Sequence, residues 1–245
     1  MLGLAPLGLY GIGFRLSSMV SFLMQAFQSA ITPMIYSRYQ EDHAPAEIAR
    51  IFRYFVFFAL LLFVALSLFS LEILMVLTTP AFHSAYIFVP FLVADQFLSG
   101  MYVFAPGLEI AKKTKYLAGI NICSAVFSIL LSIVLIYLMG LLGAAIACSL
   151  KALTVFIIQM LFSQKFYSVP HNFRKLFSSF FACGLLVLLG FATNKIIPLP
   201  FAVFIKFLIL CSCIPVMIII GIIKKSEVIH YLKQLKRIMF GAAAI

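Results

Sequence analysis

Ionisable side chains lie inside long apolar stretches of this chain. Arg15, Asp95, Lys151 and Lys206 are each flanked on both sides by mainly hydrophobic residues. A charge is costly in an apolar environment, so such groups normally face one another or a watery cavity. In those settings they bind an ion, pass a proton or hold a charged ligand. The residue types therefore indicate binding and ion coupling.

Motifs of soluble enzymes are absent from the sequence. It contains no G-x-S-x-G, no H-E-x-x-H and no P-loop. The four histidines fall in predicted loops or the tail, and the five cysteines all fall in apolar runs without zinc-ligand spacing. The histidines are His43, His83, His171 and His230, and the cysteines are Cys123, Cys148, Cys183, Cys211 and Cys213. We therefore expect no catalytic residue, no metal and no cofactor.

The composition is that of an integral membrane protein. The chain is 64% hydrophobic and 10% charged, and its mean hydropathy is +1.17. A soluble domain has roughly a quarter of its residues charged. The net charge of +11 would indicate nucleic acid in a soluble protein. Here the cations stand mainly between apolar runs, so anionic lipid and membrane topology explain them and no nucleic-acid partner is expected.

Seven apolar segments are long enough to cross a bilayer as helices. The predicted spans are about 8–37, 51–78, 84–108, 116–138, 141–163, 175–193 and 200–223. The sequence thus predicts an all-α integral membrane protein with the spans in one helical bundle over 1–223. Residues 224–245 are predicted to form a basic amphipathic cytoplasmic tail, lying on the anionic lipid surface or frayed.

The distribution of lysine and arginine predicts the orientation. The cation-rich segments are predicted to be cytoplasmic, with the amino end outside and the carboxyl end inside. Lys195 is the single cation of the opposite loops. The cations on the predicted cytoplasmic side are Arg38, Arg50, Arg53, Lys112, Lys113, Lys115, Lys165, Arg174, Lys175, Lys224, Lys225, Lys233, Lys236 and Arg237.

Polar residues recur at helical spacing in several spans, so each set shares one helix face. The faces are Arg15, Ser18, Gln25 and Ser29; Asp95, Ser99, Tyr102, Pro106 and Glu109; Asn121, Ser124, Ser128 and Ser132; and Lys151, Thr154 and Gln159. We predict a cavity in which Arg15, Gln25, Lys151 and Lys206 contact substrate. Asp95 and Glu109 are candidates for ion or proton coupling. Pro33 and Pro106, which lack a backbone N–H, are candidate hinges.

Structural explanations remain open for each of these faces. Asp95 is able to pair with Lys151 or with Arg15, and Glu109 with Lys112 or Lys113 one turn on. The Asn121 face also suits helix–helix packing. Lys206 lies close enough to the outer end of its span for its side chain to reach the interface.

Two stretches resemble a known family. LGLYGIGFRLSSMVSFLMQAFQSAITPMIYSRY (7–39) resembles the part of polysaccharide flippases that runs from a G-x-Y turn, past a basic residue, to an A-x-x-P ending. GLEIAKKTKYLAGINICSAVFSILLSIVLIYLMGLLGAAIACSL (107–150) resembles their K-K-T loop, long apolar helix and G-x-x-G-A-A-x-A helix start. Together they resemble the O-antigen or exopolysaccharide transporter (Wzx-type) branch of the multidrug/oligosaccharidyl-lipid/polysaccharide exporter superfamily.

The resemblance implies a position in a larger plan and a function. The chain corresponds to spans eight to fourteen, the C-terminal half, so the N-terminal lobe is expected in the same or a separate chain. The family moves undecaprenyl-pyrophosphate-linked oligosaccharide across the bacterial cytoplasmic membrane. Arg15 matches the basic position after the turn and is the first choice for phosphate contact. Lys151 and Lys206 have no motif match.

Other functions remain open from the sequence. A drug or cation exporter of the same superfamily and a truncated, non-transporting remnant are the nearest alternatives. A retinal protein is disfavoured because Lys206 is near one end of its span and the chain has no tryptophan. A membrane glycan ligase or polymerase is disfavoured because every predicted outer loop is short.

Overall fold

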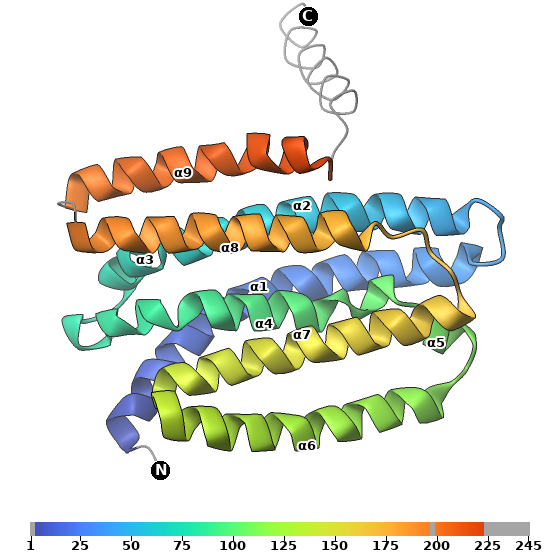
Figure 1. Cartoon of the computed structure of the whole chain (residues 1–245), viewed down its shortest axis with the longest axis horizontal. Coiled ribbons are helices and arrows are strands. Elements are labelled where there is room, and N and C mark those ends of the chain that lie inside the picture. Colours follow the sequence, from blue (N-terminus) through green and yellow to red (C-terminus); the bar gives the residue numbers. More distant parts are fainter. Residues whose placement is uncertain (1–2, 197–198, 223–245) are drawn as a thin grey trace, which may run out of the picture. The chain divides into compact units, whose positions relative to one another are not determined.

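The computed structural model describes residues 3–196 and 199–222, and within these ranges the chain is helical and contains no strand. In chain order the elements are α1 (Leu4–Arg38), α2 (Ala44–Leu68), α3 (Ser70–Leu77), the 3-10 helix η1 (Pro80–Ile87), α4 (Val89–Gly100), the 3-10 helix η2 (Met101–Phe104), α5 (Gly107–Ile110), α6 (Thr114–Met139), α7 (Leu141–Phe166), α8 (Phe173–Ile196) and α9 (Leu199–Ile220) (Figure 1). The predicted all-α membrane fold is confirmed. The predicted cytoplasmic tail lies outside the described residues.

The described residues contain six or seven membrane spans, depending on how one bent pair of helices is counted, and the count of seven agrees with the sequence prediction. Among the described residues, six helices are long and apolar enough to cross a bilayer. A seventh span is obtained if η1 and the α4–η2 segment, which are bent by 55° relative to each other, form one span. The chain is therefore a multi-pass membrane protein by the length and composition of its helices.

The second predicted span, 51–78, differs from the structure at its start and in its middle. Helix α2 begins at Ala44, and Pro45 lies in its first turn, where a missing N–H costs nothing. Arg50 and Arg53 therefore lie on a helix rather than in a loop. The helix ends at Leu68, and Phe69, which departs from helical geometry, separates it from α3.

The third predicted span, 84–108, is a series of short segments rather than one helix. Proline is placed at the start of η1 and of α4, and Pro106 separates η2 from α5. Because proline does not donate a backbone hydrogen bond, it favours new helix starts over continuation. A single continuous helix over 84–108 was thus a wrong prediction.

The described chain falls into two compact units. The first comprises the residues up to Arg50 together with Ala65–His171, and the second comprises Ile51–Val64 and the residues from Asn172 onward. In the second unit α8 and α9 pack together, with the Sγ atoms of Cys183 and Cys213 3.9 Å apart. The end of α9 is capped by Lys175, whose Nζ donates to the Gly221 carbonyl at 3.1 Å. That glycine adopts a positive φ of 81°.

Helix α7 is the element on which α4 and α6 pack in the first unit. Its small residues allow close approach: Ala145, Ala147 and Ala152 are buried. At Gly143 an added Cβ would overlap the carbonyl oxygen of Leu135 on α6. The turn between α6 and α7 is Gly140 alone, with φ +60°, so the two helices run antiparallel (Figure 1).

Side-chain hydrogen bonds fix the register of α4 and α5 along α7. Ser149 Oγ donates to the Phe91 carbonyl at 2.6 Å, and the Gly107 N–H donates to Ser163 Oγ at 2.8 Å. Residue numbers increase together along the two segments, so they run parallel. On the other side of α7, the rings of Phe162 and Phe166 contact Tyr116 at the start of α6.

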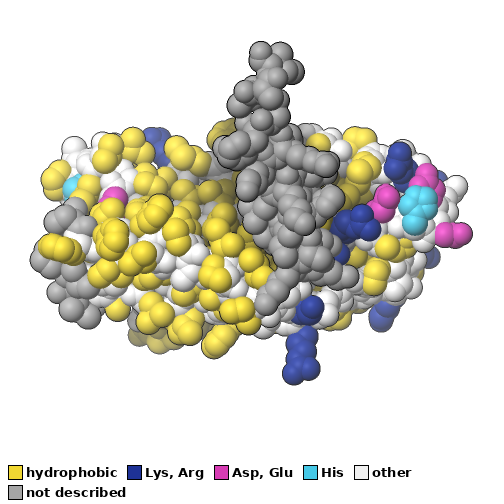
Figure 2. Space-filling model, turned by 90° about the horizontal axis from the view of Figure 1, so that it is seen from above, with side chains coloured by type: hydrophobic (Ala, Val, Ile, Leu, Met, Phe, Trp, Pro, Cys, Tyr) yellow, Lys and Arg dark blue, Asp and Glu magenta, His cyan; other side chains and the backbone are white. Residues whose placement is uncertain are grey.

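The outer surface is apolar over the helices, as expected for contact with lipid. None of the residues of α6 is buried, although the helix is strongly hydrophobic. On the face drawn in Figure 2, hydrophobic side chains form broad patches. Such apolar surfaces suit helices whose middle parts lie in hydrocarbon.

We predict that Gly143→Ala destabilises the α6–α7 hairpin by about 1–3 kcal/mol, because the new methyl overlaps the Leu135 backbone. The matched control is Gly119→Ala on α6, where nothing lies within 4 Å of the new Cβ and helix propensity gains about 0.5–1 kcal/mol. Thermal unfolding of both variants in detergent micelles measures the difference. Equal stability of the Gly143 variant and the wild type would contradict the close approach.

The burial of His171, between α7 and α8, predicts that the stability of the protein depends on pH. Burial lowers its pKa from 6.5 to about 4, and the hydrogen bond of its Nε2 with the Phe104 carbonyl partly opposes that shift. The folded protein therefore holds the neutral ring between these pH values while the unfolded chain takes up a proton. The contribution of the neutral ring to the free energy of unfolding is complete above pH 6.5. It is lost as the pH falls toward 4, and the loss reaches about 3 kcal/mol.

Thermal unfolding from pH 7 to pH 4 measures this loss. In His171→Gln the part of the pH dependence due to this residue is absent. The control His43→Gln alters an exposed histidine and should keep the wild-type profile. Parallel stability curves for the wild type and His171→Gln over the whole range would disprove the assignment.

Candidate functional site

Three of the predicted polar faces converge on one cavity of about 700 Å³ in the first unit. Helix α7 lies between α4 and α6 and contacts both. The cavity's polar lining comes from Ser99, Tyr102 and Glu109 of the α4–α5 segment, Asn121, Ser124 and Ser128 of α6, and Lys151 and Gln159 of α7. The volume lies in the range of small-molecule sites.

The helix registers order these side chains along the cavity. Antiparallel pairing of α6 with α7 places Ser128 level with Lys151, and Asn121 level with Gln159. The parallel register of α4 and α5 along α7 places Tyr102 near the level of Gln159 and Glu109 beyond it. Lys151 therefore stands toward one end of the cavity and Glu109 toward the other.

Lys151 is paired with Asp95. The Lys151 Nζ lies 3.7 Å from Asp95 Oδ1, which is an ion-pair distance beyond hydrogen-bonding range. The Asp95 side chain is 13% exposed and that of Lys151 is 32% exposed, so the carboxylate is held inside and the ammonium reaches the cavity. Of the two partners that the sequence left open for Asp95, the structure selects Lys151.

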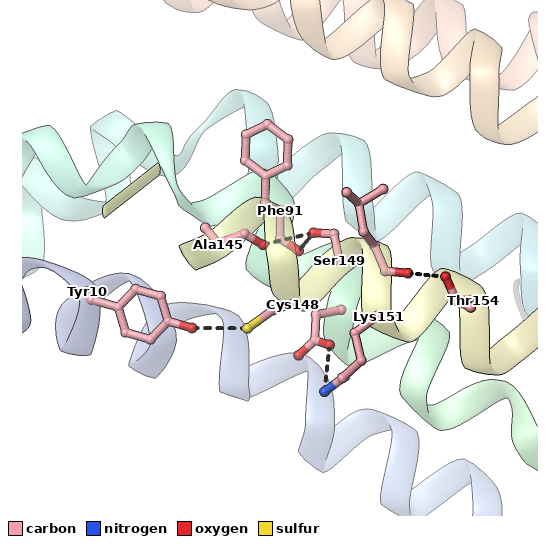
Figure 3. A network of polar contacts seen from close by, with 9 residues as sticks. Tyr10, Phe91, Ala145, Cys148, Ser149, Lys151 and Thr154 are labelled. Carbon is pink, nitrogen blue, oxygen red and sulfur yellow. Dashed lines mark hydrogen bonds and ion pairs between the residues drawn. The ribbon is translucent and has the colours of Figure 1, made fainter. Parts of the chain in front are cut away.

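Contacts around this ion pair join three helices (Figure 3). Tyr10 of α1 points toward α7, where its hydroxyl lies 3.5 Å from Cys148 Sγ. One residue on, Ser149 donates to the Phe91 carbonyl of α4. Because these contacts lie within one turn of Lys151, they restrict how α1, α4 and α7 move apart at this level.

Glu109 has a partner that the sequence did not indicate. The Tyr36 hydroxyl of α1 donates to Glu109 Oε2. No ion pair of Glu109 with Lys112 or Lys113 occurs among the described residues. Helix α5 ends at Ile110, and Lys112 has a φ of 53°, so neither lysine continues the helix face of Glu109. The expected one-turn spacing is lost there.

The remaining predicted substrate contacts lie elsewhere. Arg15 and Gln25 are exposed on α1 and do not line this cavity. Lys206 is fully buried and belongs to the second unit. Of the four predicted substrate contacts, Lys151 alone lines the cavity.

The two prolines differ in their surroundings. Pro33 lies inside the continuous helix α1, where it removes one backbone hydrogen bond. Pro106 lies at a real helix break and is followed by Gly107, where an added Cβ would overlap the Ser163 backbone. The hinge prediction for Pro106 therefore coincides with a helix break that is packed closely against α7.

Tyr102, Asn121 and Gln159 are cavity residues that the sequence did not single out as ligands. Their helical spacing was visible, but Asn121 and its serines fitted helix packing equally well. Comparisons with family models, with curated proteins and with solved structures find no match for this chain.

We predict a favourable coupling of about 0.5–3 kcal/mol between Asp95 and Lys151 in a double-mutant cycle of Asp95→Leu and Lys151→Met. Either single change leaves a charge without its partner, while the double change removes both. Denaturing-detergent titrations measure the free energy of unfolding of the wild type, the two single variants and the double variant.

The matched control cycle combines Asp95→Leu with Lys165→Met. Lys165 is an exposed cation of the same helix, and its Nζ lies over the Phe162 ring. This control pair should be additive within about 0.5 kcal/mol. Additivity in the Asp95–Lys151 cycle as well would refute the coupling.

Proposed function

We propose that this chain is part of a bacterial membrane transporter that moves a polyprenyl-pyrophosphate-linked oligosaccharide across the cytoplasmic membrane. The observation that carries the proposal is the polar cavity inside a strongly apolar helical protein. Polar groups at membrane depth are costly unless they are partnered or hydrated, so a cavity of this kind is a functional-site hypothesis by default. The flippase resemblance of residues 7–39 and 107–150 adds independent support.

The lining chemistry suits a glycan. Hydroxyl and amide groups of Ser99, Ser128, Asn121 and Gln159 provide donors and acceptors together, which a sugar's hydroxyls are able to match. An apolar drug would leave these groups without partners, at a cost of about 1–3 kcal/mol each where they are desolvated.

The lipid part of such a substrate finds a route beside the cavity. Helix α6 lines the cavity with one face, and none of its residues is buried in the protein. Outside the cavity lining, α6 exposes Ile122, Val126, Ile133 and Tyr137. In the proposal the glycan enters the cavity while the polyprenyl chain stays in the bilayer along α6, because apolar chains gain nothing from leaving lipid.

The flippase proposal also gives the exposed polar face of α1 a role. Arg15 and Gln25 lack cover within the first unit, although they lie on a membrane-length helix. The pyrophosphate or the second lobe that the resemblance implies would contact them, with Pro33 permitting α1 to bend. The topology proposed from the cations places the amino end outside and the carboxyl end in the cytoplasm.

A cationic drug is the second candidate ligand. Glu109 lines the cavity, and Asp95, outside the lining, lies beside the one lining cation Lys151, so two carboxylates stand against one ammonium. Tyr102 offers an aromatic face to a cation. Both carboxylates already have protein partners, which is why the glycan is preferred. The binding experiment below separates the two.

The absence of tryptophan makes a direct binding test possible. Leu117→Trp places a single tryptophan at the cavity wall, one turn from Asn121. We predict that a polyprenyl-pyrophosphate-linked oligosaccharide changes its fluorescence saturably when the full chain is reconstituted in lipid nanodiscs. The polyprenyl phosphate of equal chain length without sugar should bind at least tenfold more weakly.

A further probe, the glycan-free lipid and a control variant separate the alternative functions. Tetraphenylphosphonium binding in place of the lipid-linked glycan would favour the cation exporter. Equal affinity for the polyprenyl lipid with and without its glycan would remove the glycan from the proposal. A fluorescence change with Val76→Trp, an exposed position outside the cavity lining, would show that the signal arises from lipid rather than from the site.

A further inference from the structure

We propose that the middle of this cavity is a subsite for an uncharged sugar ring and that the pyrophosphate of the substrate stays outside it. This inference rests on the proposed transport function and names which part of the substrate the cavity takes. It follows from where the charges stand along the cavity and from which polar groups are left between them.

The charged side chains of the cavity stand at its two ends and have protein partners. Lys151 pairs with Asp95, and Glu109 accepts from Tyr36. In the register of α5 along α7, Glu109 lies near the level of Lys165, about 20 Å from Lys151 by helix rise. An anion bound in the middle of the cavity would therefore have no unpaired cation of the lining within reach.

The charge balance opposes a pyrophosphate in particular. Lys151 is the one cation among the lining residues, and the nearby Asp95 carboxylate already balances it. Glu109 adds a further carboxylate. Moving a multiply charged anion from water into such a site costs desolvation energy, and no unpaired positive charge returns it.

The middle level presents uncharged groups with unused hydrogen-bonding capacity. Asn121 of α6 and Gln159 of α7 line the cavity at the same level, and neither side chain hydrogen-bonds to another residue in the described part of the chain. Each amide both donates and accepts, which matches neighbouring sugar hydroxyls that do the same.

Tyr102 adds an apolar surface to this level. It lines the cavity and remains 43% exposed. An aromatic ring with a polar tip buries the C–H face of a sugar ring while its hydroxyl stays available for hydrogen bonding. Amides on α6 and α7 at the level of such a ring provide groups for a flat, hydroxyl-edged ligand.

The test uses the single-tryptophan chain Leu117→Trp in nanodiscs of zwitterionic lipid. The probes are maltotriose, a neutral trisaccharide, and inorganic pyrophosphate, titrated separately. We expect saturable fluorescence change with maltotriose and none with pyrophosphate at the same concentrations. Pyrophosphate should also leave the maltotriose affinity unchanged.

Substitutions at the middle level locate the site. Asn121→Leu and Gln159→Leu keep the side-chain size and remove hydrogen bonding, and each should weaken maltotriose binding at least tenfold. Tyr102→Phe should retain most of the affinity, while Tyr102→Ala should lose it. The matched control is Gln96→Leu, an amide of α4 outside the cavity lining. Equal thermal unfolding of all variants shows that the losses are not loss of fold.

The outcomes separate this inference from the function on which it rests. Pyrophosphate binding without maltotriose binding overturns the neutral-sugar subsite. No binding of maltotriose at millimolar concentration overturns it as well, and so does binding that Gln96→Leu weakens as much as Asn121→Leu. The transport function itself fails only if the lipid-linked oligosaccharide does not bind, so the two proposals are judged by different probes.

Discussion

Polar groups that lie inside apolar helices must find partners within the protein, and the first unit is organised around that constraint. Asp95 is the clearest case, because its carboxylate is nearly buried on a helix that lies among hydrophobic neighbours. It stays there beside the Lys151 ammonium. The pair in turn requires α4 and α7 to keep one register, which the Ser149 and Ser163 hydrogen bonds maintain. Without that register, the carboxylate would face lipid or apolar side chains.

Small residues make this arrangement possible. Gly143 brings the start of α7 against α6, and Gly107 brings α5 against Ser163. Both close contacts are made by α7, one with α6 near the start of the helix and one with α5 near its end. Between these two contacts, α7, α6 and the α4–α5 segment line the cavity. The polar side chains of the cavity are then hydrated or bound to ligand rather than buried against protein.

The division of charge between the cavity and α1 gives the proposed transporter a physical basis. Each charged side chain of the cavity has a protein partner, Asp95 for Lys151 and the Tyr36 hydroxyl for Glu109, and uncharged amides and a hydroxyl line the middle. The exposed face of α1 carries Arg15, whose charge has no balancing acid among the ion pairs of the described residues. A ligand with a neutral glycan and an anionic phosphate linkage has parts suited to each place. Separate recognition of the two parts would let one site accept different glycans on a common lipid carrier.

Composition and helical periodicity predicted the class of the protein and the polar helix faces, but of the four predicted substrate contacts only Lys151 lines the cavity. Hydropathy and span length are local properties of the chain, so the predicted spans 8–37, 116–138 and 141–163 correspond to α1, α6 and α7. Helical periodicity likewise placed Ser99, Tyr102 and Glu109 on one face, and the structure turns that face to the cavity. The breaks at Phe69 and Pro106 were not predictable from hydropathy, because a hydrophobic run looks the same whether or not its backbone is continuous. Only the tertiary structure decided which faces meet. It paired Asp95 with Lys151 instead of Arg15, joined Glu109 to Tyr36, and left Arg15 and Lys206 outside the cavity. Such choices depend on the register and approach of helices far apart in the chain, which depth and spacing along a single helix do not encode.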